Sequence, residues 1–154
     1  MTPVSTWMST PVVSVGPLDF VERAREVMEE RRINQLPVVQ DGRLVGIVTD
    51  RDLGDAFPSL LDVLSNETES PILPPNVRVG AVMTRGVLTV APGETVARAA
   101  DMLRRERIGS APVVDQDHVV GILTRSDCLA ALIAAATSVH SHRRRARPQH
   151  GLPA

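Results

Sequence analysis

Two threonine–aspartate pairs have the residue types and spacing of a sugar-binding site. Thr49 and Asp52 stand three residues apart, and Thr124 and Asp127 repeat this T-x-x-D pattern later in the chain. Each pair follows an apolar run typical of a strand and precedes a helical segment, so both pairs lie at a predicted helix start. A carboxylate can accept hydrogen bonds from two neighbouring ribose hydroxyls, and the threonine hydroxyl can reach the same sugar or a phosphate. The free N–H groups of a helix start favour anions as well.

The same pattern also fits a capping box, in which the two side chains only stabilise the helix. A single T-x-x-D favours capping, whereas two equivalent copies, each after Val-Gly-Ile, favour a ligand site. The two roles can coexist on the same residues.

The elements that must position these pairs belong to an internal repeat. A displacement of 75 positions aligns Met8–Leu53 with Met83–Cys128 without a gap, and 17 of the 46 positions are identical. Repeats of this kind are one folding unit used more than once. The chain is therefore predicted to contain the same unit twice.

Each copy has the pattern of a β-α-β-β-α unit. A short β-prone run ends at a proline, an apolar stripe at helical spacing follows, and two further apolar runs precede T-x-x-D. Asp41-Gly42 between the last two runs is a hairpin signal, whereas the second copy has residues 115–118 there, so we expect a different turn. One unit buries too little surface alone. We therefore expect an α/β (α+β) fold in which the two units pack sheet to sheet with pseudo-twofold symmetry.

These patterns set the expected boundaries. The first repeat spans residues 7–57, a connector with a short helix near its start spans 58–81, and the second repeat spans 82–138. Residues 139–154 carry four arginines and no acid, and we expect them to form a disordered basic tail.

The last helix is apolar on all sides from Cys128 to Ala136. Such a helix needs cover on more than one side, so we expect a homodimer through these terminal helices. A monomer whose connector covers the exposed face is the alternative.

The ordered pattern of each copy resembles a CBS domain, and its tandem occurrence resembles a CBS domain pair, or Bateman module. The matching residues are IxxLPVV and LVGIVTDRD within Ile33–Asp52, and IxxAPVV and VVGILTRSD within Ile108–Asp127. The resemblance covers about residues 7–138. The acidic connector and the TDRD and TRSD endings are also similar to the small stand-alone CBS proteins of acetoin utilisation.

The resemblance implies a regulatory sensor that binds an adenine nucleotide or adenosyl ligand (AMP, ADP, ATP or S-adenosylmethionine) between the repeats. Asp52 and Asp127 would hold ribose beside Thr49 and Thr124. The expected base pocket contains Ser14, Asn34, Leu36, Pro37, Thr89, Gly109, Ala111 and Pro112. No other cofactor is expected.

The phosphate contacts follow the family pattern less closely. Similar pairs often place histidine or arginine before the strand proline, where this chain has the neutral residues Asn34-Gln35 and Gly109-Ser110. The candidate phosphate ligands are instead Arg32, Arg51, Arg107 and Arg125. Because Asp50 stands beside the first site and Arg125 beside the second, we expect the second to bind anions better.

Other functions are less well supported by the sequence. No histidine or cysteine has a catalytic partner at recognisable spacing, so we expect no enzyme, and a single cysteine, Cys128, excludes a disulfide or a multi-thiolate metal site within the chain. The alternative is a ligand-free structural or protein-interaction dimer whose basic tail contacts nucleic acid, although few aromatic residues are present for stacking on bases. Without a signal-like or membrane-spanning segment, the chain is expected in the cytoplasm, regulating an unknown protein.

Overall fold

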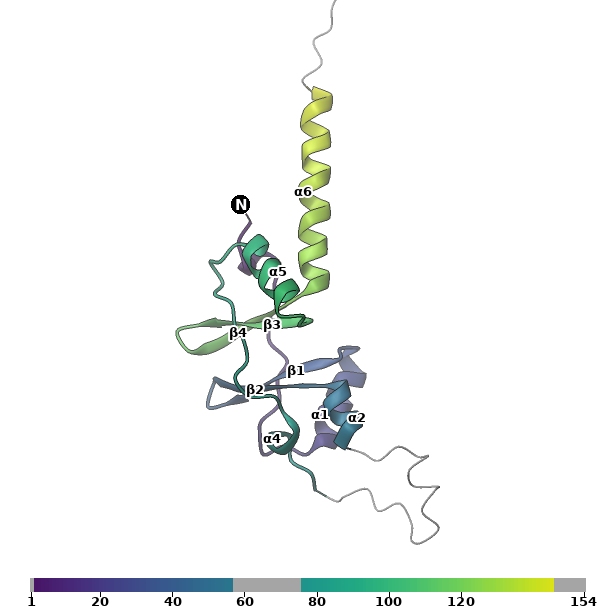
Figure 1. Ribbon diagram of the computed structural model, residues 1–154, viewed down its shortest axis with the longest axis vertical. Coiled ribbons are helices and arrows are strands. Elements are labelled where there is room, and N and C mark those ends of the chain that lie inside the picture. The colour runs from purple at the N-terminus through teal and green to yellow at the C-terminus, as the bar shows by residue number, and fades with distance from the viewer. Residues whose placement is uncertain (1, 57–75, 146–154) are drawn as a thin grey trace, which may run out of the picture.

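The computed structural model describes residues 2–56 and 76–145, with side chains for residues 2–55 and 76–138. Its elements in chain order are η1 (Val4–Thr6), α1 (Val21–Arg31), β1 (Gln35–Gln40), β2 (Arg43–Thr49), α2 (Asp50–Ala56), α4 (Val79–Val82), α5 (Val96–Arg105), β3 (Ser110–Asp115), β4 (His118–Thr124) and α6 (Arg125–Arg145) (Figure 1). The short helix expected near the start of the connector lies outside the described residues.

The two repeats stack with their hairpins in the middle and their helices outside. In Figure 1, α5 and α6 lie beyond the β3–β4 hairpin, while α1, α2 and α4 lie beyond the β1–β2 hairpin. The strand order is β1-β2-β4-β3, and β2 meets β4 only at the pair Arg43 and His118. The predicted mixed fold of two tandem repeats is confirmed.

Both hairpins close through the same two-residue turn. Asp41 and Gly42 have φ of 52° and 78°, and Gln116 and Asp117 have φ of 46° and 67°. Two successive positive φ values are typical of a type I′ turn, whose twist matches that of the strands. The expectation of a different second turn was wrong, because the matching strand register imposes this conformation on Gln116 although it lacks the preference of glycine.

The predicted first strand of each copy is reduced to one parallel bridge. The N–H of Val15 donates to the Pro37 carbonyl at 3.1 Å, and the N–H of Val39 donates to the Val15 carbonyl at 2.8 Å. The next bonds of this ladder would need N–H groups on Pro37 in one direction and on Pro17 in the other, and proline has none. The second copy, around Val90, has prolines at the same positions.

Two hydrophobic cores form, and the segment at the start of each repeat packs on the other repeat. Val4 is fully buried in the core of the second repeat, with Met8 packed against it, whereas Val79 and Met83 are buried in the core of the first. These crossing segments bridge to the central strands, Ser9 to Ile122 and Thr84 to Ile47. The repeats are therefore interlocked rather than merely adjacent.

The glycine of each Val-Gly-Ile run permits this crossing. A Cβ on Gly46 would lie 2.6 Å from the sulfur of Met83, and one on Gly121 would lie 2.5 Å from the sulfur of Met8. A side chain at either position would therefore displace the crossing segment.

The terminal helix α6 is 21 residues long and extends well past α5 (Figure 1). Residues 139–145 continue this helix, although we expected a disordered tail from residue 139. The exposed fractions of Leu129, Leu132 and Ile133 are 59%, 65% and 66%. None of the helices in the described ranges is long and apolar enough to cross a bilayer.

Candidate functional site

Each T-x-x-D pair forms a reciprocal capping box at a helix start. The Thr49 N–H and hydroxyl donate to Oδ2 of Asp52 at 2.8 and 2.9 Å, and the Asp52 N–H donates back to the threonine hydroxyl oxygen at 3.2 Å. Thr124 and Asp127 repeat the arrangement at 2.7, 2.8 and 3.2 Å. These bonds satisfy backbone N–H groups that have no hydrogen-bond partner within the first turn of a helix. The capping role that the sequence allowed is therefore present in both repeats.

The capping bonds use only one oxygen of each carboxylate. Within residues 2–56 and 76–138, no donor contacts Oδ1 of Asp52 or Asp127, and both residues are half-buried. A carboxylate oxygen has two acceptor sites. Each pair can therefore cap its helix and still accept hydrogen bonds from a ligand.

A cleft of about 430 Å³ lies between the repeats, and residues of both repeats line it. Gln35 and Pro37 lie at the start of β1, and Ile33 and Asn34 immediately precede it. Thr124 comes from the end of β4, immediately before α6. The remaining lining residues are Ser9, Pro11, Val13, Arg32 and Ile122. The cleft therefore combines the base-pocket region of one repeat with Thr124 of the other. Asp127, which Thr124 contacts, is not among the lining residues, and neither are Thr49 and Asp52.

The predicted base-pocket residues do not all face this cleft. Asn34 and Pro37 line it, Pro37 with a fully buried side chain, whereas Leu36 and Ala111 are buried in the two cores and are not among the lining residues. Strand alternation explains this, because Leu36 lies on the face opposite its neighbours in β1. Ser14 is exposed and outside the lining.

The second-repeat members of that prediction are more dispersed. Thr89 lines a separate cavity of about 440 Å³ near the hairpin turns. Pro112 is fully buried, as is its equivalent Pro37, but it does not line the cleft. Gly109 is exposed, with no atom within 4 Å of the position that a Cβ would occupy. Its carbonyl accepts a hydrogen bond from the N–H of Arg125 at 3.0 Å, so Gly109 lies beside the second T-x-x-D.

Of the four candidate phosphate ligands, only Arg32 lines the cleft. Arg51 is exposed on α2. Arg107 and Arg125 line a groove between α5 and α6, and the Arg125 side chain donates from Nε to the Ile108 carbonyl at 2.9 Å. These two arginines therefore lie at a different surface from the one we expected, because the first turn of α6 directs Arg125 toward the end of α5.

Several cleft residues could not be found from local sequence patterns. Ser9 and Pro11 precede the first predicted strand and Val13 lies within it, and their segment reaches the cleft because Ser9 crosses to Ile122 of β4. The only sequence signal was that Ser9 and Thr84 are equivalent under the repeat alignment. That equivalence shows that the segment belongs to the repeat. It does not show which of the two units the segment contacts.

Other reactive side chains have structural surroundings. Burial, and then the charge of Asp127, raises the pKa of the Cys128 thiol. His118 Nδ1 lies 2.9 Å from the Gln116 carbonyl in the hairpin turn. Among the residues that the structure describes, no group of three or more histidine, cysteine or acidic side chains could hold a metal ion.

Comparison with known proteins identifies the same family in both repeats. The CBS domain family matches residues 4–59 and 79–134. Some curated relatives are much longer enzymes: the chain is 34% identical over 119 residues to an inosine-5′-monophosphate dehydrogenase of Thermoplasma acidophilum and spans 21% of its length. The similarity to this enzyme is therefore confined to about a fifth of its length.

Solved structures resemble almost the whole chain. CBSX2 in complex with AMP is 29% identical with a TM-score of 0.72, and the match covers 88% of this chain and 99% of that one. The CBS domain pair of MJ0100, in complex with 5′-methylthioadenosine and S-adenosyl-L-methionine, is 28% identical with a TM-score of 0.70, covering 88% and 98%. A putative acetoin utilization protein from Vibrio cholerae is 26% identical with a TM-score of 0.71, covering 96% and 99%.

Proposed function

Because the chain belongs to the CBS domain family and carries two CBS domains in tandem, we propose that it is a non-enzymatic sensor that binds an adenosyl ligand in the cleft between them. The observation that carries this proposal is the composite lining of the cleft, where Asn34 and Pro37 of one repeat meet Thr124 of the other. Two similar structures were solved with adenosyl compounds, which supports the ligand class.

Each part of such a ligand has a proposed partner. The ribose hydroxyls donate to Oδ1 of Asp127, whose other oxygen is held by Thr124. The adenine lies among the apolar side chains of Ile33 and Ile122, and the Asn34 amide hydrogen-bonds to its edge. Arg32 is the nearest candidate for a phosphate. The repeat alignment gives Thr49 and Asp52 the same proposed role at the pseudo-symmetric position, with Gly109 and Pro112 beside the base.

Isothermal titration calorimetry with AMP, ADP, ATP and S-adenosylmethionine tests the proposal. Asp127→Asn retains an oxygen that can cap the Thr124 N–H, so it separates binding from helix stability, which Asp127→Ala does not. We expect Asp127→Asn to weaken binding about 5- to 150-fold, which corresponds to ~1–3 kcal/mol. Asp52→Asn makes the matched change in the other repeat. No heat from any of the four compounds with the wild-type protein would contradict the proposal.

We also propose that two chains associate through α6, as the exposed apolar residues of this helix favour. Ile133 is 66% exposed and lies outside the groove between α5 and α6, so a second copy can cover it. Light scattering coupled to size exclusion should show a dimer for the wild type and a monomer for Ile133→Glu. The regulated protein and the expected cytoplasmic location remain predictions.

A further inference from the structure

Among the described residues, Arg32 is the only charged one that lines the cleft between the repeats. All other lining residues are apolar or neutral. Within residues 2–55 and 76–138, the guanidinium group of Arg32 has no hydrogen-bond or ion-pair partner. Its five N–H donors are therefore available to a ligand in the cleft.

The backbone of Arg32 has a conformation that arginine rarely adopts. Arg32 follows the last residue of α1 with φ of 53° and ψ of 44°, in the left-handed region. Many helices end with a residue in this region, and it is usually glycine or sometimes asparagine, because a larger side chain brings Cβ too close to the following carbonyl oxygen. Strained residues of this kind cluster at ligand sites. The position of Arg32 therefore suits glycine or asparagine better, unless the arginine side chain has a use in the cleft.

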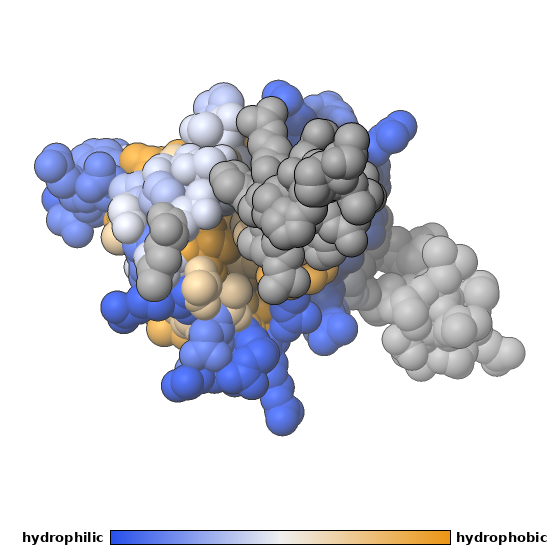
Figure 2. Space-filling view, turned by 90° about the horizontal axis from the view of Figure 1, so that it is seen from above, coloured by the Kyte–Doolittle hydropathy of each residue, from blue (hydrophilic) through white to orange (hydrophobic). Residues whose placement is uncertain are grey.

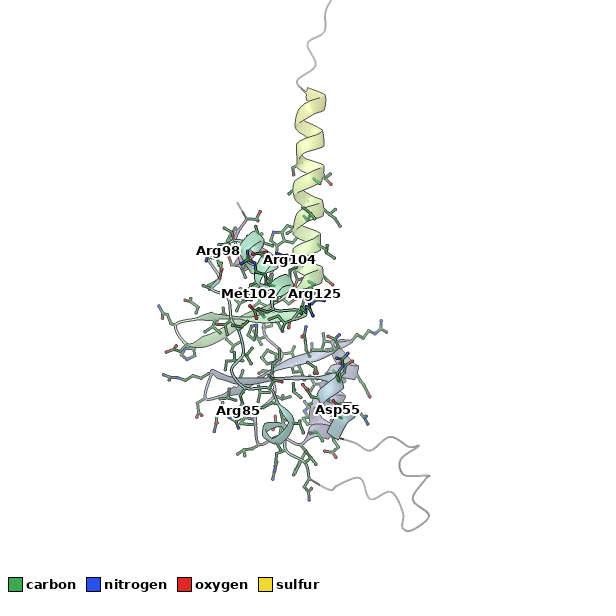
Figure 3. All side chains as sticks on the ribbon, in the orientation of Figure 1. Asp55, Arg85, Arg98, Met102, Arg104 and Arg125 are labelled. Carbon is green, nitrogen blue, oxygen red and sulfur yellow. The ribbon has the colours of Figure 1, made fainter. Side chains whose placement is uncertain are left out.

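The equivalent residue of the second repeat, Arg107, has the same conformation in different surroundings. Its φ is 55°, but it lines the groove between α5 and α6 together with Arg104 and Arg125. Figure 2, which looks down on this end of the molecule, shows hydrophobic side chains gathered among hydrophilic ones. Figure 3 shows Arg104 and Arg125 close together where the two helices meet. None of these three arginines lines the cleft, so Arg107 is a matched control for Arg32.

We propose that Arg32 sets the phosphate preference of the cleft, so that the cleft binds adenosine 5′-monophosphate more tightly than adenosine and at least as tightly as the di- or triphosphate. This inference rests on the proposed function of the cleft. A guanidinium group forms two parallel hydrogen bonds to one phosphate. A single arginine therefore matches a single phosphate.

Additional phosphates have no second cation among the described lining residues. Two acids stand close to that lining instead. The N–H of Asp50 donates to the carbonyl of Asn34 at 2.9 Å, and Asp127 accepts from the hydroxyl of Thr124 at 2.8 Å. Because like charges repel, a second or third phosphate adds negative charge to the ligand without gaining a partner in the cleft.

Calorimetric titration of the full chain with adenosine, AMP, ADP and ATP measures this preference. The titrations are done without divalent cations, which would neutralise the phosphates of ATP. We expect AMP to bind about 10- to 100-fold more tightly than adenosine, as hydrogen bonds to a charged group predict. ADP and ATP should bind no more tightly than AMP.

Matched variants assign the effect to Arg32. Arg32→Asn should weaken AMP binding about 10- to 100-fold and change adenosine binding by less than about 2-fold, because it removes only the phosphate partner. Asparagine tolerates the left-handed conformation, so the melting temperature of this variant without ligand should equal or exceed that of the wild type. Arg107→Asn should do the same to the melting temperature and leave both affinities unchanged. Arg32→Lys, which keeps the charge but not the planar fork, should keep part of the preference for AMP.

Three results would overturn the inference: adenosine binding as tightly as AMP, ATP binding more than about 10-fold more tightly than AMP, or an equal loss of AMP affinity in Arg32→Asn and Arg107→Asn. Adenosine binding that Asp127→Asn weakens, without any preference for AMP, would contradict this inference and leave the proposed function intact. No binding of any of the four compounds would contradict both.

Discussion

Substitution of Gly46 by alanine should destabilise the protein by about 3–5 kcal/mol. The new methyl carbon would lie 2.6 Å from the Met83 sulfur and 2.9 Å from the carbonyl oxygen of Thr84. That carbonyl accepts the Ile47 N–H at 3.0 Å, and the Thr84 N–H donates to the Ile47 carbonyl at 2.8 Å. Overpacking costs typically 1–3 kcal/mol, and loss of two hydrogen bonds adds roughly 1 kcal/mol each.

Gly121→Ala should cost less, about 1–2 kcal/mol, although it makes the same change in the other repeat. Its closest contact, at 2.5 Å, is the flexible Met8 side chain, and the nearest backbone atom, the Ser9 carbonyl oxygen, is 3.2 Å away. Displacing the end of a flexible methionine side chain costs less free energy than displacing a backbone segment that is hydrogen-bonded to a strand.

Urea unfolding monitored by circular dichroism measures both changes, with Gly54→Ala as the control. Gly54 lies in α2, and a Cβ there meets no atom within 4 Å. Alanine favours a helix by about 1 kcal/mol over glycine, so this variant should equal or exceed the wild type. If Gly46→Ala unfolds at the same urea concentration as Gly54→Ala, the crossing segment does not pack on β2 as described.

Three further predictions concern single side chains. The Cys128 thiol should react slowly with Ellman's reagent at neutral pH, with an apparent pKa above that of a free cysteine, because burial and the Asp127 charge disfavour the thiolate; rapid reaction would contradict this. Ser110→Ala should leave the free energy of unfolding unchanged or raise it, since the buried Ser110 hydroxyl has no partner among the described residues; a loss above about 1 kcal/mol would reveal a missing interaction. Gly42→Ala should lower the melting temperature by at least about 4 °C, because Gly42 has a φ of 78° and its Cβ would lie 2.8 Å from His118; an unchanged melting curve would contradict the turn geometry.

The repeat, the hairpins and the helix starts could be predicted because their signals are local. Asp41-Gly42 predicts its turn without reference to the rest of the chain, and T-x-x-D predicts a capped helix start. Both are present in the structure. The second turn shows the limit of such signals, because strand register overrides the weak preference of Gln116.

The crossing of segments could not be predicted, because it depends on contacts between residues far apart in the chain. Ser9 contacts Ile122, and Thr84 contacts Ile47. Neither contact has a periodicity or a turn residue that would identify it. Site residues that depend on the crossing were missed for the same reason, and Leu36 was assigned to the pocket although strand alternation turns it into the core.

Intermolecular nuclear Overhauser effects between bound AMP and methyl-labelled protein test the central claim most directly. The adenine ring protons should show contacts to the methyl groups of Ile33 and Ile122, which line the cleft between the repeats. Contacts only to Leu129 and Leu132, in the groove between α5 and α6, would show that the ligand binds elsewhere and would contradict the account.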